Sequence, residues 1–226
     1  MRSLAIFAAT IAIVSAVLPV QAATLFTFPF TNNYDPSVID SSLSTVGLGI
    51  FPGTSPGNAI IRNNGFGRIL SVFPATGVTD TASALAQNVF LVPLQIGFTA
   101  QPTSNGNTVN LATLSFEVGK GGASGPRGYF IRSTADNLSS DIIAELLPDG
   151  QDAPVQRTVN LSAPIYQNVT SVNFLFYVYA PAGANNSVDF RNVSVTSPGV
   201  VVPEASTGLL ALCVVPALGV LVRRRR

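Results

Sequence analysis

The stretch Ser171-Val-Asn-Phe-Leu-Phe-Tyr-Val-Tyr179 decides the fold class. Apolar residues recur at every second position, which is the period of a pleated β-strand with one face turned to a core. The other face mixes one amide with apolar and aromatic side chains, so we expect that face to be partly covered as well. The first set is Val172, Phe174, Phe176 and Val178, and the second is Asn173, Leu175, Tyr177 and Tyr179.

The same alternation recurs along the chain. Leu114–Val118 alternates apolar with polar residues, and so does Val155–Leu161, where Arg157 interrupts the apolar phase. Both patterns predict strands with one buried face. Further strands are expected at Leu25–Phe28, Ile69–Phe73, Val89–Phe98, Tyr129–Ser133 and Val188–Val195.

The last of these strands changes phase, because Val188 and Phe190 share one parity whereas Val193 and Val195 share the other. A strand can bury both sets on one side only with an extra residue, so we predict a β-bulge near Arg191-Asn192.

Turns and helix are read from local signals. The dipeptides Asn64-Gly65, Asn105-Gly106 and Asp149-Gly150 predict tight turns. Asp141–Leu147 is expected as a strand, and Asp80 as the N-cap of one helical turn.

Residues 31–68 are rich in Gly, Pro, Asn and Ser and predict long loops around short edge strands. About nine short antiparallel strands then favour two stacked sheets. We therefore predict an all-β fold, an antiparallel, jelly-roll-like β-sandwich over residues 23–197.

The N-terminus has the pattern of a secretory signal peptide. Met1-Arg2 is followed by an apolar run over Leu4–Val20 and then by small residues. Residues 1–22 are therefore expected to form a signal helix that is cleaved between Ala22 and Ala23.

The C-terminus predicts a membrane segment. After a linker at 198–202, Ala205–Val222 holds 18 uncharged residues, close to the roughly 20 that span a bilayer as a helix. Arg223–Arg226 would stop transfer and stay cytoplasmic. The middle portion would then lie outside the cytoplasm.

Residues 203–226 resemble the PEP-CTERM sorting signal, with Ala205 standing where that family has a second proline. The resemblance implies passage through the Sec translocon, brief anchoring in the inner membrane of a Gram-negative-type bacterium, and removal of the tail by an exosortase, a membrane transpeptidase. The product would reach the cell surface or an extracellular, biofilm-type matrix, with exopolysaccharide as a possible partner. The residues that carry the resemblance are Pro203, Glu204, Arg223, Arg224, Arg225 and Arg226.

The second half of the middle portion resembles galactose-binding-type jelly rolls that often precede such tails. This resemblance implies no established activity. It does suggest a structural calcium near the terminal strand, with Asp189 as the candidate ligand. The stretches that carry it are Leu114–Val118, Ser124–Ser133, Asn173–Tyr179 and Val188–Val195.

Charge and composition exclude several functions. Arg2 and Arg223–Arg226 account for five of the twelve basic residues and Glu204 for one of the eleven acidic ones, so the remaining seven and ten give the middle portion a net charge of −3. Such a domain does not attract nucleic acid. The chain has no histidine, and its single cysteine, Cys213, lies in the apolar tail segment. Triads and His-ligated zinc sites are excluded, so we expect no enzyme and no cofactor, although a pair of carboxylates remains possible in principle.

Two non-enzymatic functions are left. One is a matrix or surface protein that acts through adhesion or packing. The other is a polysaccharide-binding module in which Tyr177 and Tyr179 stack on sugar rings, with Arg132 or Asn173 as polar partners. Alternatively, both tyrosines cover the edge of a second core with their hydroxyls in water.

Overall fold

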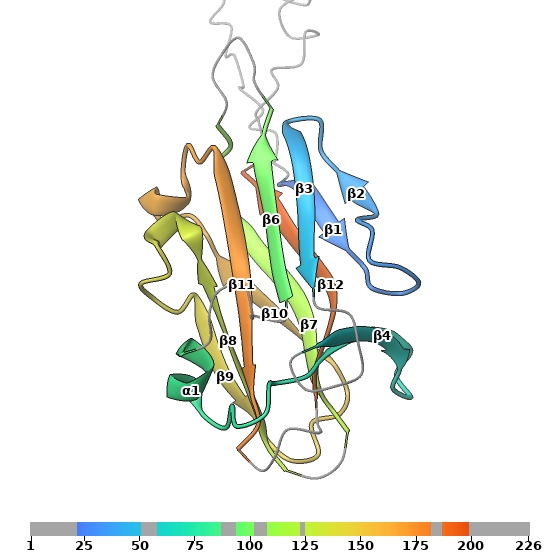
Figure 1. Ribbon diagram of the computed structural model, residues 1–226. Helices are drawn as coiled ribbons and strands as arrows, with labels where there is room; N and C mark the ends of the chain where they lie inside the picture. Colours follow the sequence, from blue (N-terminus) through green and yellow to red (C-terminus); the bar gives the residue numbers. More distant parts are fainter. Residues whose placement is uncertain are drawn as a thin grey trace, which may run out of the picture. The chain divides into compact units, whose positions relative to one another are not determined.

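Two antiparallel sheets lie face to face and form a β-sandwich, seen in the computed structural model (Figure 1). The structure describes residues 22–50, 58–86, 94–101, 108–122, 125–181 and 187–198. All of them belong to one compact unit, Ala22–Pro198. The fold class expected from strand alternation is therefore confirmed as an antiparallel β-sandwich.

The two sheets differ in size. The seven-stranded sheet, sheet A, runs in the order β10-β7-β12-β1-β2, and β5 joins it by pairing with β12 and with β4. Its strands are β1 Ala23–Phe28, β2 Val38–Ile39, β4 Ala59–Asn63, β5 Arg68–Val72, β7 Thr113–Gly121, β10 Val155–Asn160 and β12 Ser187–Ser197.

The five-stranded sheet, sheet B, runs in the order β3-β6-β11-β8-β9. Its strands are β3 Leu43–Ile50, β6 Leu94–Ala100, β8 Arg127–Ser133, β9 Ile143–Leu147 and β11 Ser171–Tyr179. The short helical elements are α1 Thr81–Leu85, η2 Thr134–Asp136 and η3 Pro164–Tyr166.

Several local expectations are confirmed. The register between β12 and β7 shifts between Arg191 and Ser194, so the bulge lies where the phase change put it. Asn192 within it has φ +52°, a left-handed conformation that asparagine tolerates. Asp80 caps α1, because its Oδ1 accepts the backbone N–H of Ser83 at 2.7 Å.

One expectation about the chain was wrong. Among the described residues of 31–68 the edge strands are not all short, because β3 is eight residues long and pairs with β6 along its whole length. Its glycines obscured the alternation of Val46, Leu48 and Ile50 with Thr45, Gly47 and Gly49.

Other expectations fall partly or wholly outside the described residues. These are the first half of Val89–Phe98, the turn at Asn105-Gly106 and both terminal segments, with Pro203, Glu204 and Arg223–Arg226. Ala22 is exposed and Ala23 opens β1. Within the described ranges, no helix has the length and apolar character that crossing a membrane requires.

Aromatic rings from both sheets meet in the middle of the core. Phe190 of β12 lies edge-on to Phe176 of β11, with ring centroids 5.3 Å apart, and to Tyr129 of β8 at 5.7 Å. Phe116 of β7 completes the group with edge contacts to the other three rings. Such pairs add about 0.5–1.5 kcal/mol each beyond the area they bury, so this cluster fixes the spacing of the sheets.

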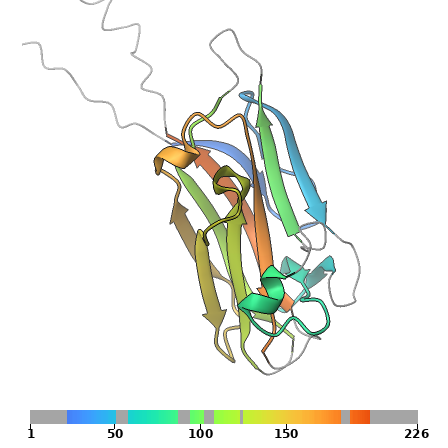
Figure 2. The same ribbon diagram turned by 60° about the vertical axis from the view of Figure 1, so that its left-hand side comes forward.

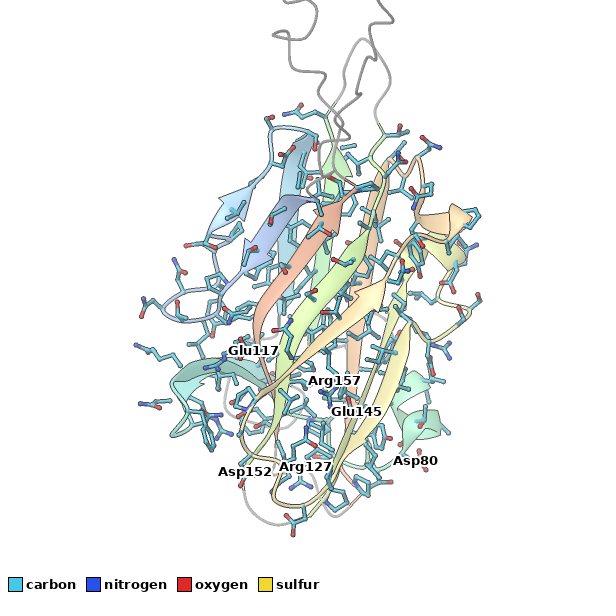
Figure 3. All side chains as sticks on the ribbon, turned by 180° about the vertical axis from the view of Figure 1, so that it is seen from behind. Asp80, Glu117, Arg127, Glu145, Asp152 and Arg157 are labelled. Atoms are coloured by element: carbon cyan, nitrogen blue, oxygen red, sulfur yellow. The ribbon has the colours of Figure 1, made fainter. Side chains whose placement is uncertain are left out.

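A charged clamp closes one side of the sandwich. Arg157 of β10 binds Glu145 of β9 with two hydrogen bonds, Nε to Oε2 at 2.8 Å and Nη2 to Oε1 at 2.5 Å. The hydroxyl of buried Tyr129 donates to the same Oε2 at 2.8 Å. Figure 3 shows Glu145 and Arg157 side by side, on the strands where the two sheets meet. The arginine that interrupts the apolar phase of β10 therefore joins the two sheets.

The Arg157 hydrogen bonds hold the pKa of the Glu145 carboxyl below its ordinary value. A lowered pKa contributes stability that is complete above the ordinary pKa and is lost as the pH falls through the lowered one. We predict that Arg157→Gln lowers the free energy of unfolding at pH 7 by about 1–2 kcal/mol. The difference from the unmodified protein should shrink between about pH 5 and pH 3.

Urea unfolding at pH 7 and at about pH 3 measures the difference in unfolding free energy between the variant and the unmodified protein. The control variant is Arg68→Gln, at an exposed position of β5. An Arg157→Gln deficit that stays constant on acidification contradicts the clamp.

Candidate functional site

The four binding candidates from the sequence lie on one surface, the outer face of sheet B. Asn173, Tyr177 and Tyr179 share the outward parity of β11, and Arg132 of β8 stands opposite Leu175 in the same orientation. The outer face turns away from β7, β12 and β10, which lie behind it in Figure 1. The structure therefore places all four candidates on one face of sheet B.

Tyr177 is not available as a stacking platform. Its side chain is only 3% exposed, and its ring stacks on Phe130 with centroids 4.7 Å apart and planes within 4°. Val78 and Ala84, from the segment that includes α1, cover this pair, and burial raises the pKa of the Tyr177 hydroxyl. The alternative in which the tyrosine belongs to a second core describes Tyr177 correctly.

Tyr179 is half-buried and lies against the backbone of β8. A Cβ added to Gly128 would stand 1.8 Å from the Tyr179 Cζ atom, so the end of the ring fills the space above that glycine. Gly128 and Tyr179 are cross-strand partners. Only glycine lets the ring settle this close to the sheet.

Arg132 marks the border of this covered region. Its Nε donates to Asp141 Oδ1 at 2.6 Å and its Nη1 to the Leu138 carbonyl at 2.7 Å. The guanidinium carbon also lies 5.8 Å from the centre of the Phe130 ring. Arg132 is thus oriented and neutralised within the protein, beside the buried Phe130–Tyr177 pair.

The rest of the outer face forms a strip of small and polar residues, here called the polar lane. Its members share outward parity on three neighbouring strands, and most of them are exposed. They are Thr45, Gly47 and Gly49 of β3, Gln95, Gly97 and Thr99 of β6, and Ser171 and Asn173 of β11.

Glycines form the floor of the polar lane. Gly47 pairs with Gly97, and Gly97 pairs in turn with Asn173. A Cβ on Gly47 would meet no atom within 4 Å, whereas one on Gly97 would overlap Asn173 Oδ1 at 1.9 Å. The amide of Asn173 therefore lies over Gly97, next to open space above Gly47 that a ligand can enter.

The chemistry of the polar lane is that of uncharged hydrogen bonding. Gln95 and Asn173 each supply amide donors and an acceptor, and Thr45, Thr99 and Ser171 supply hydroxyls. None of the eight residues of the polar lane is charged. Such a surface suits a ligand rich in hydroxyl groups.

Sequence reasoning identified Asn173 but missed the other members of the polar lane. The signal was the alternation over Thr45–Ile50, which the two glycines hid. Gln95 and Thr99 follow the same parity in Leu94–Ala100, where Leu94, Ile96 and Phe98 are buried.

Asp189 lies elsewhere, on the outer face of sheet A, and its surroundings do not match a calcium site. Ser187 Oγ donates to Oδ1 at 2.6 Å and Asn64 Nδ2 to Oδ2 at 2.9 Å. The guanidinium Nη2 of Arg62 lies 3.9 Å from Oδ1. Calcium requires six to eight oxygen ligands, and the described residues contain no group of three or more Asp, Glu, His or Cys that could hold a metal. Asp189 instead links β4 and its hairpin turn to β12.

Several carboxylates are paired with cations in structural contacts. Lys120 Nζ lies 3.1 Å from Asp149 and 3.2 Å from Asp152. A backbone hydrogen bond from Gly125, aided by Lys120, lowers the pKa of the Asp149 carboxyl, and that of Glu145 is lowered as well. A general acid needs a raised pKa, so neither carboxyl suits the role of general acid.

Comparison with known proteins gives structural neighbours only. No protein-family model matches the sequence, and no curated protein is significantly similar. A xylan-binding domain of carbohydrate-binding module family 22 has 8% identity and a TM-score of 0.42, covering 80% of this chain and 98% of that domain. A xylan-binding domain of the same family from Paenibacillus barcinonensis has 11% identity and a TM-score of 0.41, covering 81% and 100%.

A family 29 module complexed with mannohexaose has 9% identity and a TM-score of 0.38, covering 79% of this chain and 94% of that one. These identities and scores are too low to assign a family or a ligand to this chain.

The contrast between two glycines of sheet B provides a test of the outer face. We predict that Gly128→Ala lowers the free energy of unfolding by about 1–3 kcal/mol, because its methyl group expels the Tyr179 ring. Gly47→Ala is the matched control and should change it by less than about 0.5 kcal/mol. Urea unfolding measures both, and near-ultraviolet circular dichroism reports the displaced tyrosine. Equal effects of the two variants contradict the placement of Tyr179.

Proposed function

We propose that this protein is a non-enzymatic β-sandwich that binds a neutral polysaccharide along the polar lane, outside the cell. The observation that carries the proposal is the uncharged, glycine-floored strip over β3, β6 and β11, with the amide of Asn173 beside open space above Gly47. Figure 2, turned from the view of Figure 1, offers a second view of these three strands.

The match is chemical as well as geometric. Sugar hydroxyls both donate and accept hydrogen bonds, as do the amide and hydroxyl side chains of the polar lane. Arg132, on the outer face of the neighbouring strand β8, is compensated by Asp141 at 2.6 Å, so this arginine does not make the surface favour an anionic chain over a neutral one.

Affinity is expected to be modest. Hydrogen bonds exchanged with water contribute only about 0.5–1.5 kcal/mol each, and Tyr177 is withdrawn from stacking. A dissociation constant of about 0.1–1 mM for a short oligosaccharide follows from these terms. A long polymer that meets many copies of the protein binds more tightly through multivalency.

Delivery to the surface is a second part of the proposal, and sequence features support it. The signal-like N-terminus and the PEP-CTERM-like tail flank the compact unit Ala22–Pro198. We propose Sec-dependent export, removal of the tail by an exosortase and release to the cell surface or matrix. A purely adhesive matrix protein remains the rival function, and the absence of saturable glycan binding would favour it.

Gly47→Leu tests the ligand surface directly. The leucine would stand in the open space of the polar lane, so we expect at least a tenfold loss of affinity with the sandwich intact. Isothermal calorimetry with soluble xylan and mannohexaose, the sugars named for the compared structures, measures the loss.

The control is Ser115→Leu, on the outer face of sheet A, which should bind like the unmodified protein. Binding that survives Gly47→Leu and is lost in Ser115→Leu contradicts the proposed surface.

Mass spectrometry of the product made by the native bacterium tests delivery. We expect a chain that begins at Ala23 and lacks the arginine-terminated tail, recovered from the cell surface or the medium. Recovery of an intact Met1–Arg226 chain from the cytosol contradicts export and sorting together.

A further inference from the structure

β3 forms one edge of sheet B among the described strands. β3 has the sequence Leu43-Ser-Thr-Val-Gly-Leu-Gly-Ile50, which contains no charged residue and no proline. β6 pairs with one side of it, and no described strand pairs with the other. Proteins usually protect long edge strands with charges, prolines, bulges or short length, because an open edge is a template for another strand.

The other edges among the described strands carry such protection. β9, at the opposite edge of sheet B, turns Glu145 inward to Arg157 of β10, the edge strand of sheet A. β2 is only two residues long, and β4 carries Arg62. β3 is eight residues long and has a single register shift near its start, between Leu43 and Thr45.

The inward side chains of β3 show that this edge is incompletely covered. Val46 and Leu48 pack against the main core but stay only partly buried. A further strand beside β3 would cover them and would pair with the backbone groups of β3 that face away from β6. On the outer face, Thr45, Gly47 and Gly49 are small, so β3 itself places no large side chain between its edge and a partner.

We propose that two copies of this protein pair through β3 in antiparallel fashion, so that their five-stranded sheets join into one. A strand that pairs with itself about a two-fold axis forms an isologous contact, in which each residue meets its symmetry-related set. The absence of charge on β3 removes like-charge repulsion between the copies. Backbone hydrogen bonds at the edge lie in the plane of the sheet, so the two polar lanes come side by side without being covered.

Opposite charges introduced at Thr45 in separate variants test the pairing. Sedimentation equilibrium should show the unmodified protein in a monomer–dimer equilibrium. With the two-fold axis at Val46, Thr45 of each copy lies opposite Gly47 of the other copy and diagonal to its own counterpart. Thr45→Lys and Thr45→Glu should then each weaken dimerisation at least tenfold, because the pair brings like charges together. An equimolar mixture of the two variants should dimerise again, which a misfolded pair could not do.

The control is Thr158→Lys, at an exposed position of β10, the edge strand that carries Arg157. This variant should dimerise like the unmodified protein. Hydrogen exchange of the unmodified protein gives a measurement without variants, since amides of residues 43–50 should exchange more slowly as concentration rises. Any one of three results overturns the proposal. They are a protein that stays monomeric at about 1 mM, a dimer that is insensitive to both Thr45 variants, and exchange of amides 43–50 that is independent of protein concentration.

Discussion

The packing of four aromatic rings between the sheets is the contact on which the rest of the structure depends. Phe116 and Phe190 reach it from sheet A, and Phe176 and Tyr129 from sheet B. Because these rings fill the inner faces, the outer face of sheet B is left with the residues of opposite parity. The position of Asn173 on that face follows directly from the burial of Phe174 and Phe176 beside it.

Tyr129 links this core to the side of the sandwich. Burial raises the pKa of its hydroxyl, which donates to Glu145, so the phenol stays protonated and the carboxylate stays bound between it and Arg157. One side of the sandwich is thereby closed by charge. The described residues of the β3 side form no comparable ion pair. Sheet B therefore has one edge, β9, that is protected by a charged pair and one edge, β3, that lacks this protection.

Much of the fold could be predicted from the sequence because strand alternation, the bulge at Arg191-Asn192 and the Asp80 cap are local signals. The cover over Tyr177 could not be predicted, because it depends on α1 and Val78 packing onto Phe130, a contact between segments distant in sequence.

The polar lane was missed for a different reason. Glycine is a turn residue by propensity, yet in β3 it is tolerated because its neighbours Val46 and Leu48 pack on the core, so tertiary packing overrides propensity. The surroundings of Asp189 could not be predicted either, because a single strand pattern does not reveal that Arg62 of β4 lies 3.9 Å from its carboxylate.

We propose that polysaccharide binds along the polar lane of sheet B. The most direct test of this proposal is a titration of isotope-labelled protein with mannohexaose and with xylan fragments, followed by backbone amide chemical shifts. If the polar lane binds the glycan, saturable shifts should cluster at Gly47, Gly97 and Asn173, with the amides of sheet A unchanged. Saturable shifts confined to sheet A, or no shifts with any neutral glycan, would contradict it.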